Sequence, residues 1–301
     1  MFSSEPCRCG QAPRVVLAIG VWIGLLAGRV IAALRQERPA QRRLRVCILE
    51  SGEPARRLAK ALLASERPLL DAEAVFLCGS DWAAFDPTTD LGGGRLCTVV
   101  AEPWFRGVGQ SWGPAALVQL QAMHRSLRQR LHNGGPRRLA VLPRAGTVMA
   151  CAVECPTLWA GQQPLGTVCG FDLGAFNTLR CPEHFETIAG VPLWAHRHRL
   201  LTAPTPVLRI DVDGGEEIGE GSVALVELAV AHSGRCDGIA LWVNTELDGE
   251  VVEPGAPSPA RPDKRQGLRL LERPRQLEAG GELTLLVRRW GAGARLEVSV
   301  A

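Results

Sequence analysis

Apolar residues in the first half of the chain fall into short runs that alternate with longer amphipathic segments. Four of these runs predict buried strands, at residues 15–20, 45–50, 74–78 and 96–101. The amphipathic segments predict helices at residues 25–37, 54–65 and 114–132, and the last helix ends at an Asn-Gly-Gly turn. Strands that alternate with helices indicate a parallel sheet with helices on its faces.

After about residue 144 the helical period fades, and short runs of β-forming residues lie between Gly and Pro turns. These runs predict strands at residues 147–154, 207–212, 223–230, 238–247, 268–272, 282–290 and 294–300. Many short strands at fairly regular spacing favour a barrel or a sandwich. The sequence therefore predicts two domains, an α/β domain at residues 1–143 and a β domain at residues 144–301.

The composition excludes few classes of protein. The 301 residues are 46% hydrophobic and 22% charged, which is ordinary for a globular protein, and a net charge of +3 gives no nucleic-acid footprint. The ten cysteines are irregularly spaced, and Cys47 and Cys97 sit inside apolar runs, which favours buried thiols over disulfides. No Cys or His spacing matches a common metal site, so no metal ligand is predicted. The expected location is cytoplasmic and/or nuclear.

The apolar run at residues 15–28 leaves a second interpretation of the N-terminus open. Arg14 precedes the run, which gives it the form of a signal-peptide core in a secreted or membrane-anchored protein. The run is short for a membrane span and Arg29 interrupts it. A buried strand, a glycine turn and a helix explain the same residues, and cell fractionation separates the two interpretations.

The same segment has the strand–glycine–helix form of a loop that binds a nucleotide-type cofactor. Gly20 and Gly24 would let the backbone approach a ligand closely, although Trp22 stands where a third glycine is expected. Glu50 ends the second predicted strand, where an acid can hydrogen-bond a ribose hydroxyl pair. An ordinary loop and a solvated strand end explain these residues equally well, so this pattern alone leaves the function open.

Several segments, in consistent order, resemble the protein arginine methyltransferase family. They are LGGGRLCTVVAEPWF (91–105), RLAVLPRAGTVMACAVECPTLW (138–159), CGFDLGAFN (169–177), PLW (192–194) and CDGIALWVNTEL (236–247), and the match spans roughly residues 15–300. The resemblance is greatest to the second, C-terminal module of the family's seventh member, the two-module monomethylating type. It implies a Rossmann-like S-adenosylmethionine methyltransferase sheet, then a β-barrel with a dimerisation arm inserted at about residues 172–200.

The family moves a methyl group from S-adenosylmethionine to an arginine guanidinium that two glutamates hold. Glu102 matches the first glutamate, but Ser111 stands where the second is expected. One carboxylate and a hydroxyl cannot form a bidentate clamp on a guanidinium. The family's Thr-His-Trp loop falls at residues 262–264, where this chain has Pro-Asp-Lys. The resemblance therefore implies one remaining catalytic residue, Glu102, in an incomplete site.

The cofactor site that the resemblance implies is also altered. Its candidate residues in this chain are Gly20, Gly24, Glu50 and Asp81. Ala18 replaces the acid before the glycine loop, and the chain has no tyrosine to form the family's lid over the cofactor. S-adenosylmethionine is the expected cofactor if this site is retained, and otherwise none is expected.

These departures predict a degenerate module that serves as the structural, dimerisation half for a catalytic module. The expected partner is another arginine methyltransferase module, in the same polypeptide or in a dimer, with no direct contact to nucleic acid or membrane. Phe176, Phe185, Ile188 and Leu193 in the arm are expected to be buried by that partner, or else to cap the barrel. The alternative is an active enzyme on arginine-containing proteins that uses Glu102 alone.

Overall fold

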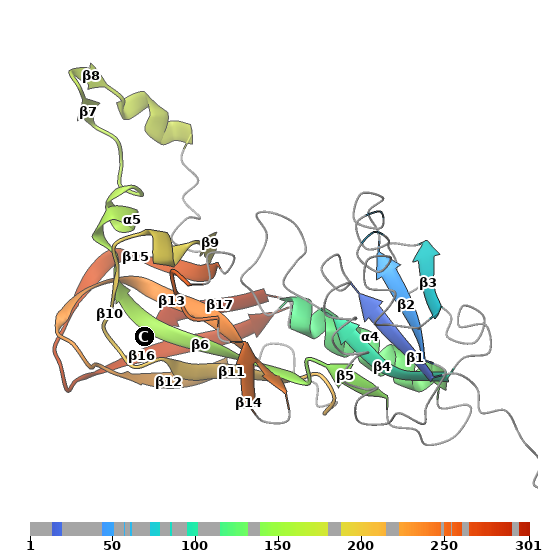
Figure 1. Cartoon of the computed structure of the whole chain (residues 1–301). Coiled ribbons are helices and arrows are strands. Elements are labelled where there is room, and N and C mark those ends of the chain that lie inside the picture. Colours follow the sequence, from blue (N-terminus) through green and yellow to red (C-terminus); the bar gives the residue numbers. More distant parts are fainter. Residues whose placement is uncertain are drawn as a thin grey trace, which may run out of the picture. The chain divides into compact units, whose positions relative to one another are not determined.

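A computed structural model describes fifteen parts of the chain, and they fall into two compact units. The described residues are 14–19, 44–50, 57, 61, 73–78, 85, 95–101, 115–131, 139–179, 188–214, 223–247, 250–253, 255–260, 265–290 and 295–301. One unit takes residues 1–105 and 122–142, and the other takes residues 106–121 and 143–301. The first contains a parallel sheet and the second contains antiparallel sheets (Figure 1).

The first unit is built on a five-stranded sheet with the order β3-β2-β1-β4-β5. Its strands are β1 (Arg14–Ile19), β2 (Leu44–Glu50), β3 (Glu73–Cys78), β4 (Arg95–Ala101) and β5 (Ala140–Leu142). All neighbouring pairs are parallel. The four predicted strands and the parallel sheet are therefore confirmed, while β5 was not predicted. The helices expected at 25–37 and 54–65 lie outside the described residues, apart from Arg57 and Ala61, whose backbone is helical.

Helix α4 (Ala115–Leu131) confirms the amphipathic helix that the sequence predicts. Its buried side chains recur at intervals of three and four residues, whereas the polar side chains between them are exposed or half-buried. The buried residues are Leu117, Val118, Leu120, Gln121, Met123, His124 and Leu127. The imidazole Nε2 of His124 lies 2.9 Å from the carbonyl oxygen of Leu139, so this buried histidine has a structural hydrogen bond.

The second unit consists mainly of antiparallel strands. In order these elements are β6 (Ala145–Glu154), α5 (Pro156–Ala160), β7 (Thr167–Val168), β8 (Phe171–Asp172), η2 (Gly174–Leu179), β9 (Ala189–Val191), η4 (Leu193–Ala195), β10 (Arg199–Leu200), β11 (Thr205–Asp211), β12 (Val223–Ala229), β13 (Gly234–Leu247), β14 (Glu250–Glu253), β15 (Gln266–Leu277), β16 (Glu282–Trp290) and β17 (Arg295–Val300). All seven predicted strands are present, and the short strands β7 to β10 and β14 are additional.

Hydrogen bonds join these strands into three sheets. A seven-stranded sheet has the path β10-β6-β13-β15-β9, with β11 on β6 and β14 on β13. A three-stranded sheet has the order β12-β16-β17, and β7 and β8 form a hairpin. Among the described residues, an isolated antiparallel bridge pairs Thr202, shortly after β10, with Val230, directly after β12. The β-rich second half is confirmed, whereas closure of a barrel stays a prediction.

The core of the second unit lies against β6 and β13. A cluster of buried residues packs there. Its members come from β6, β13, β15, the N-cap of α5 and η4: Cys151, Val153, Cys155, Leu193, Ala240, Trp242, Leu268 and Leu270. Trp242 is its largest member and is 2% exposed. Strand β6 is paired along both edges, with β11 and β13, and its side chains are buried on both faces of the sheet. It is therefore the central strand of this unit.

Candidate functional site

The carboxyl ends of the central parallel strands meet at one edge of the first unit's sheet. Ile19 of β1 pairs with Leu49 of β2 on one side and with Ala101 of β4 on the other. Glu50, the last residue of β2, pairs with Cys78, the last residue of β3. From β1 the chain adds β2 and β3 on one side of the sheet and then β4 and β5 on the other. Ligands of open α/β sheets bind at such a switch point.

Four of the five candidate residues follow these strand ends in the sequence, and their own positions lie outside the described residues. Gly20 comes directly after β1 and Glu102 directly after β4, while Gly24 and Asp81 come a few residues beyond β1 and β3. Glu50 is within β2, although its side chain is not among those described. The topology thus brings together the strands that lead to the candidates. Their roles in cofactor binding and catalysis stay predictions.

A second candidate site is the folded segment between residues 165 and 179, named here the arm tip. Strands β7 and β8 form a hairpin whose two-residue turn is Cys169-Gly170, with φ of 51° and 84°. Two positive φ angles suit a tight hairpin turn with the right-handed twist of its strands. Leu173 N–H donates to Gly166 O at 3.0 Å, which closes the base of this hairpin.

Asn177 holds the helical part of the arm tip to its first residue. Its amide Nδ2 donates to Leu165 O at 2.7 Å, and its Oδ1 accepts from Leu165 N–H at 2.8 Å. Gly174 N–H donates to the carboxylate of Asp172 at 2.8 Å, where the chain turns into η2. These local hydrogen bonds give the arm tip a defined shape without a hydrophobic core of its own.

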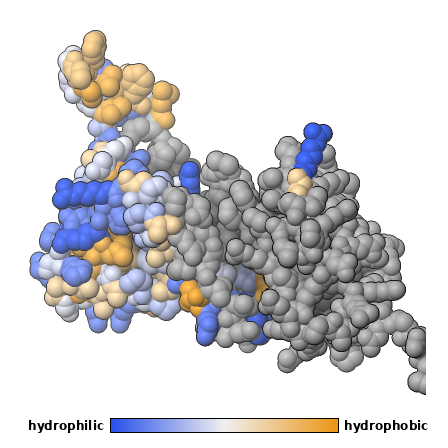
Figure 2. All heavy atoms as spheres, viewed as in Figure 1, coloured by the Kyte–Doolittle hydropathy of each residue, from blue (hydrophilic) through white to orange (hydrophobic). Residues whose placement is uncertain are grey.

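The arm tip exposes large apolar side chains. Their exposed fractions are 44% for Leu165, 46% for Val168, 71% for Phe171, 56% for Phe176 and 80% for Leu179. Figure 2 shows the same apolar character gathered over β7, β8 and η2. Clustered apolar side chains on an ordered surface are the mark of a protein–protein contact site, whereas single ones are normal.

The structure corrects one of the four arm residues proposed to meet a partner. Leu193 is fully buried by its own chain in the core cluster, so it belongs to the interior of this unit. Phe176 is exposed in the isolated chain, Ile188 is half-buried, and Phe185 lies outside the described residues, so burial of the arm by a partner stays a prediction. Phe171 was missed, although an apolar residue directly after the tight Cys-Gly turn is a usable signal of exposure.

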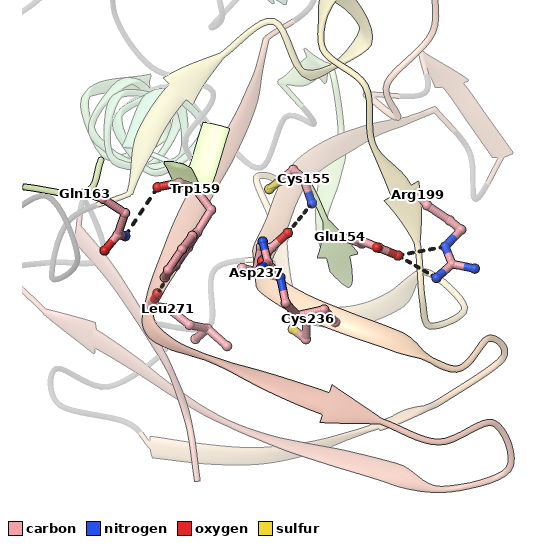
Figure 3. Close-up of polar contacts among 10 residues, drawn as sticks. Glu154, Cys155, Trp159, Gln163, Arg199, Cys236, Asp237 and Leu271 are labelled. Atoms are coloured by element: carbon pink, nitrogen blue, oxygen red, sulfur yellow. Dashed lines mark hydrogen bonds and ion pairs between the residues drawn. The ribbon is translucent and has the colours of Figure 1, made fainter. Parts of the chain in front are cut away.

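The cysteines of β6 and β13, and Cys155 directly after β6, are buried thiols. Burial raises the pKa of the Cys155 thiol to about 12, and the nearby Asp237 carboxylate and Cys236 add to the effect (Figure 3). Burial also raises the pKa of Cys236 to about 11, and that of Cys151 above its usual value. Neutral buried thiols behave as small apolar side chains, and Cys47 is buried as the sequence predicted, whereas Cys169 is exposed.

These shifts predict a loss of stability at alkaline pH. An unfolded thiol ionises near pH 9, while folded Cys155 keeps its proton to about pH 12, so the unfolded chain binds fewer protons between these values. The free energy of unfolding is therefore expected to fall as pH rises through this window. Denaturant titration from pH 8 upward measures it, and Cys155→Ala and Cys236→Ala should each flatten the slope. An unchanged slope in both variants would contradict the assignment.

Among the parts of the chain that the structure describes, no three His, Cys, Asp or Glu residues are grouped to hold a metal ion. His198 Nδ1 lies 2.8 Å from the carbonyl of His196, a local backbone contact. No helix within the described ranges has the length and apolar character to cross a membrane.

Known proteins with similar sequence are arginine methyltransferases. No protein-family model matches the chain. Protein arginine N-methyltransferase 7 of Danio rerio is 29% identical over 171 residues, which make up 54% of this chain and 23% of that protein. Its namesake in Drosophila melanogaster is 26% identical over 212 residues, 64% of this chain and 29% of that protein. The chain spans less than a third of the length of these relatives.

Known structures with the same fold are arginine methyltransferases as well. The crystal structure of PRMT6 superposes with a TM-score of 0.58 at 14% identity, covering 97% of this chain and 93% of that one. A Trypanosoma brucei PRMT1 enzyme–prozyme heterotetrameric complex with AdoHcy gives 0.61 at 13% identity, with 97% and 86% covered. The chain thus has an S-adenosylmethionine methyltransferase fold followed by a β-rich unit. Sequence and fold together identify it as a relative of the protein arginine methyltransferases.

Proposed function

We propose that the chain is a non-catalytic arginine methyltransferase module that docks through its arm tip on a catalytic module of the same family. The observation that carries this proposal is the exposed apolar surface of the arm tip, led by Phe171 and Phe176. The local hydrogen bonds of Asn177 and Asp172 give that surface a fixed shape before it meets a partner, which lowers the entropic cost of docking.

The sequence supports the non-catalytic half of the proposal. Ser111 stands in place of the second glutamate, and residues 262–264 share nothing with the family's Thr-His-Trp loop. The trypanosomal PRMT1 complex is described as an assembly of an enzyme with a prozyme, so heteromeric assembly has a precedent in the family. A module of this kind would stabilise the catalytic half rather than bind the arginine substrate itself.

An active enzyme is the second candidate, because the switch point of the parallel sheet is intact. It would hold S-adenosylmethionine at Gly20, Gly24, Glu50 and Asp81, and would act on arginine-containing proteins through Glu102 alone. One glutamate would then have to orient the guanidinium and keep a nitrogen lone pair directed at the transferred methyl group. The missing second carboxylate weakens this arrangement, because a bidentate pair fixes geometry as well as charge.

Calorimetric titration of the purified chain with S-adenosylmethionine separates the two candidates. The non-catalytic proposal predicts no heat of binding up to millimolar cofactor, in the wild type and in Glu50→Ala and Gly20→Trp alike. Micromolar binding that Glu50→Ala abolishes would favour the active enzyme and overturn the non-catalytic proposal. Weak binding that neither variant alters would mean that the cofactor uses other residues.

A further inference from the structure

Both ends of the arm are fixed at the same place on β6. Glu154, the last residue of β6, is the register partner of Arg199 in β10, so the chain leaves and returns at one point. Arg199 Nε and Nη2 lie 3.0 and 2.5 Å from Glu154 Oε2, and Nη2 also donates to Ser233 O at 3.0 Å. The excursion between them, residues 155–198, includes the arm tip (Figure 1).

A buried carboxylate from β13 holds the first residue of this excursion. Asp237 is 0% exposed, and its Oδ2 accepts from Cys155 N–H at 2.8 Å (Figure 3). Arg235 Nε lies 2.7 Å from Asp237 Oδ1 and forms an ion pair with it. The angle of this contact is too poor for a hydrogen bond, and Oδ1 accepts none from the described residues. The Arg235 guanidinium also lies 5.1 Å from the centre of the Trp159 ring, and Trp159 Nε1 donates to Leu271 O at 2.8 Å.

These contacts form a closed set that joins α5 to two strands of the seven-stranded sheet. Asp237 and Arg235 come from β13, Leu271 from β15, and Cys155 and Trp159 from the start of the excursion. Cys155 is the N-cap residue of α5 and makes no side-chain cap hydrogen bond of its own. Burying a carboxylate in a sheet is unfavourable unless it is paired. Here its partners are Arg235 and the N–H of Cys155, and the latter contact fixes the point at which α5 leaves β6.

We propose that Asp237 is a positioning residue that, through Arg235 and Trp159, sets the direction in which the arm leaves the seven-stranded sheet. The role in docking rests on the proposed function, because the arm tip can meet a partner only in the orientation that its base imposes. The positioning itself is a property of the isolated chain. An ion pair whose carboxylate is buried, and which is separate from the docking surface, thus controls how that surface is presented.

Hydrogen exchange of the full chain, read by mass spectrometry over residues 152–163, tests the proposal. Asp237→Asn keeps an acceptor for Cys155 N–H but removes the charge, and charge-assisted hydrogen bonds are about twice as strong as neutral ones. Exchange over this segment is therefore expected to rise about tenfold, while the midpoint of global denaturant unfolding changes little. Arg144→Ala is the matched control, because its exposed ion pair with Asp213, at 3.4 Å, is of ordinary surface type.

A second variant keeps the test decisive if Asp237→Asn does not fold. Arg235 is 43% exposed, so a glutamine side chain fits at this position, where its amide can still donate a hydrogen bond to Asp237. Arg235→Gln removes the ion pair and the contact with Trp159, so its midpoint of global unfolding is measured beside the exchange. Faster exchange at 152–163 in this variant supports the positioning role, and exchange equal to that of Arg144→Ala overturns it. If exchange rises but the wild-type chain binds no partner, the docking function fails and the positioning of the arm stands.

Discussion

Changing Phe171 and Phe176 together to serine is expected to weaken docking on a catalytic module roughly 100-fold or more. A phenylalanine buries about 150–250 Å² when it is covered, and an aromatic anchor at the centre of an interface contributes about 2 kcal/mol or more. Two such losses amount to about 4 kcal/mol, a factor of about 1000, and incomplete additivity reduces it. Both side chains are already more than half exposed, so the fold should tolerate the change.

The measurement is a sedimentation titration of the chain against each full-length arginine methyltransferase of the same organism, and against itself. Val223→Ser with Leu225→Ser is the matched control, since these β12 side chains are 56% and 68% exposed but lie outside the arm tip. The control pair is expected to leave the Kd unchanged. Equal weakening by the two pairs would show a general effect of lost apolar surface and would contradict docking through the arm tip.

Replacing Trp242 with alanine is expected to lower the free energy of unfolding by about 3–5 kcal/mol, because the change leaves a large cavity in a close-packed core. Trp242 is 2% exposed and packs in the cluster around β6 and β13. Its indole Nε1 has no hydrogen-bond partner among the described residues, and a buried unpaired donor is unfavourable. Trp242→Phe should therefore cost only about 1 kcal/mol, since loss of the donor offsets part of the lost packing.

Denaturant unfolding followed by circular dichroism measures both Trp242 variants. Trp194→Ala serves as a comparison, because that side chain is only partly buried and its loss should be smaller. Similar losses for Trp242→Phe and Trp242→Ala would mean that the indole N–H stabilises the fold, contrary to its unpaired position.

The longer strands of both units were predictable because each has enough consecutive positions to show a pattern, whereas the unpredicted strands have only two to four residues. Strands β1 to β4 are apolar runs of six or seven residues, and β6 and β13 are longer still. Strands β7, β8 and β10 contain only two residues each, too few for an alternation to be read. The hairpin of β7 and β8 depends on a tight turn, and β10 depends on pairing with β6, which is distant in sequence.

The candidate sites were predictable to different degrees. The strand ends that lead to Gly20, Glu50 and Glu102 could be placed at one sheet edge from the alternation of elements alone. Leu193 was misplaced because an apolar residue in the arm gives no sign of whether its own chain or a partner covers it. Asp237 could not be found, since its role requires Cys155, which is distant in sequence and directly follows the neighbouring strand β6, to lie beside it.

Under the proposed function, the chain docks on a catalytic module and performs no methyl transfer itself. Radiolabelled methyl transfer from S-adenosylmethionine to an arginine-rich peptide tests it most directly, with the chain alone, with the catalytic methyltransferase that binds it, and with both together. We expect no transfer by the chain alone, and a rate for the pair that rises with the wild-type chain but not with the Phe171→Ser, Phe176→Ser variant. Methyl transfer by the chain alone, abolished by Glu102→Gln, would contradict it.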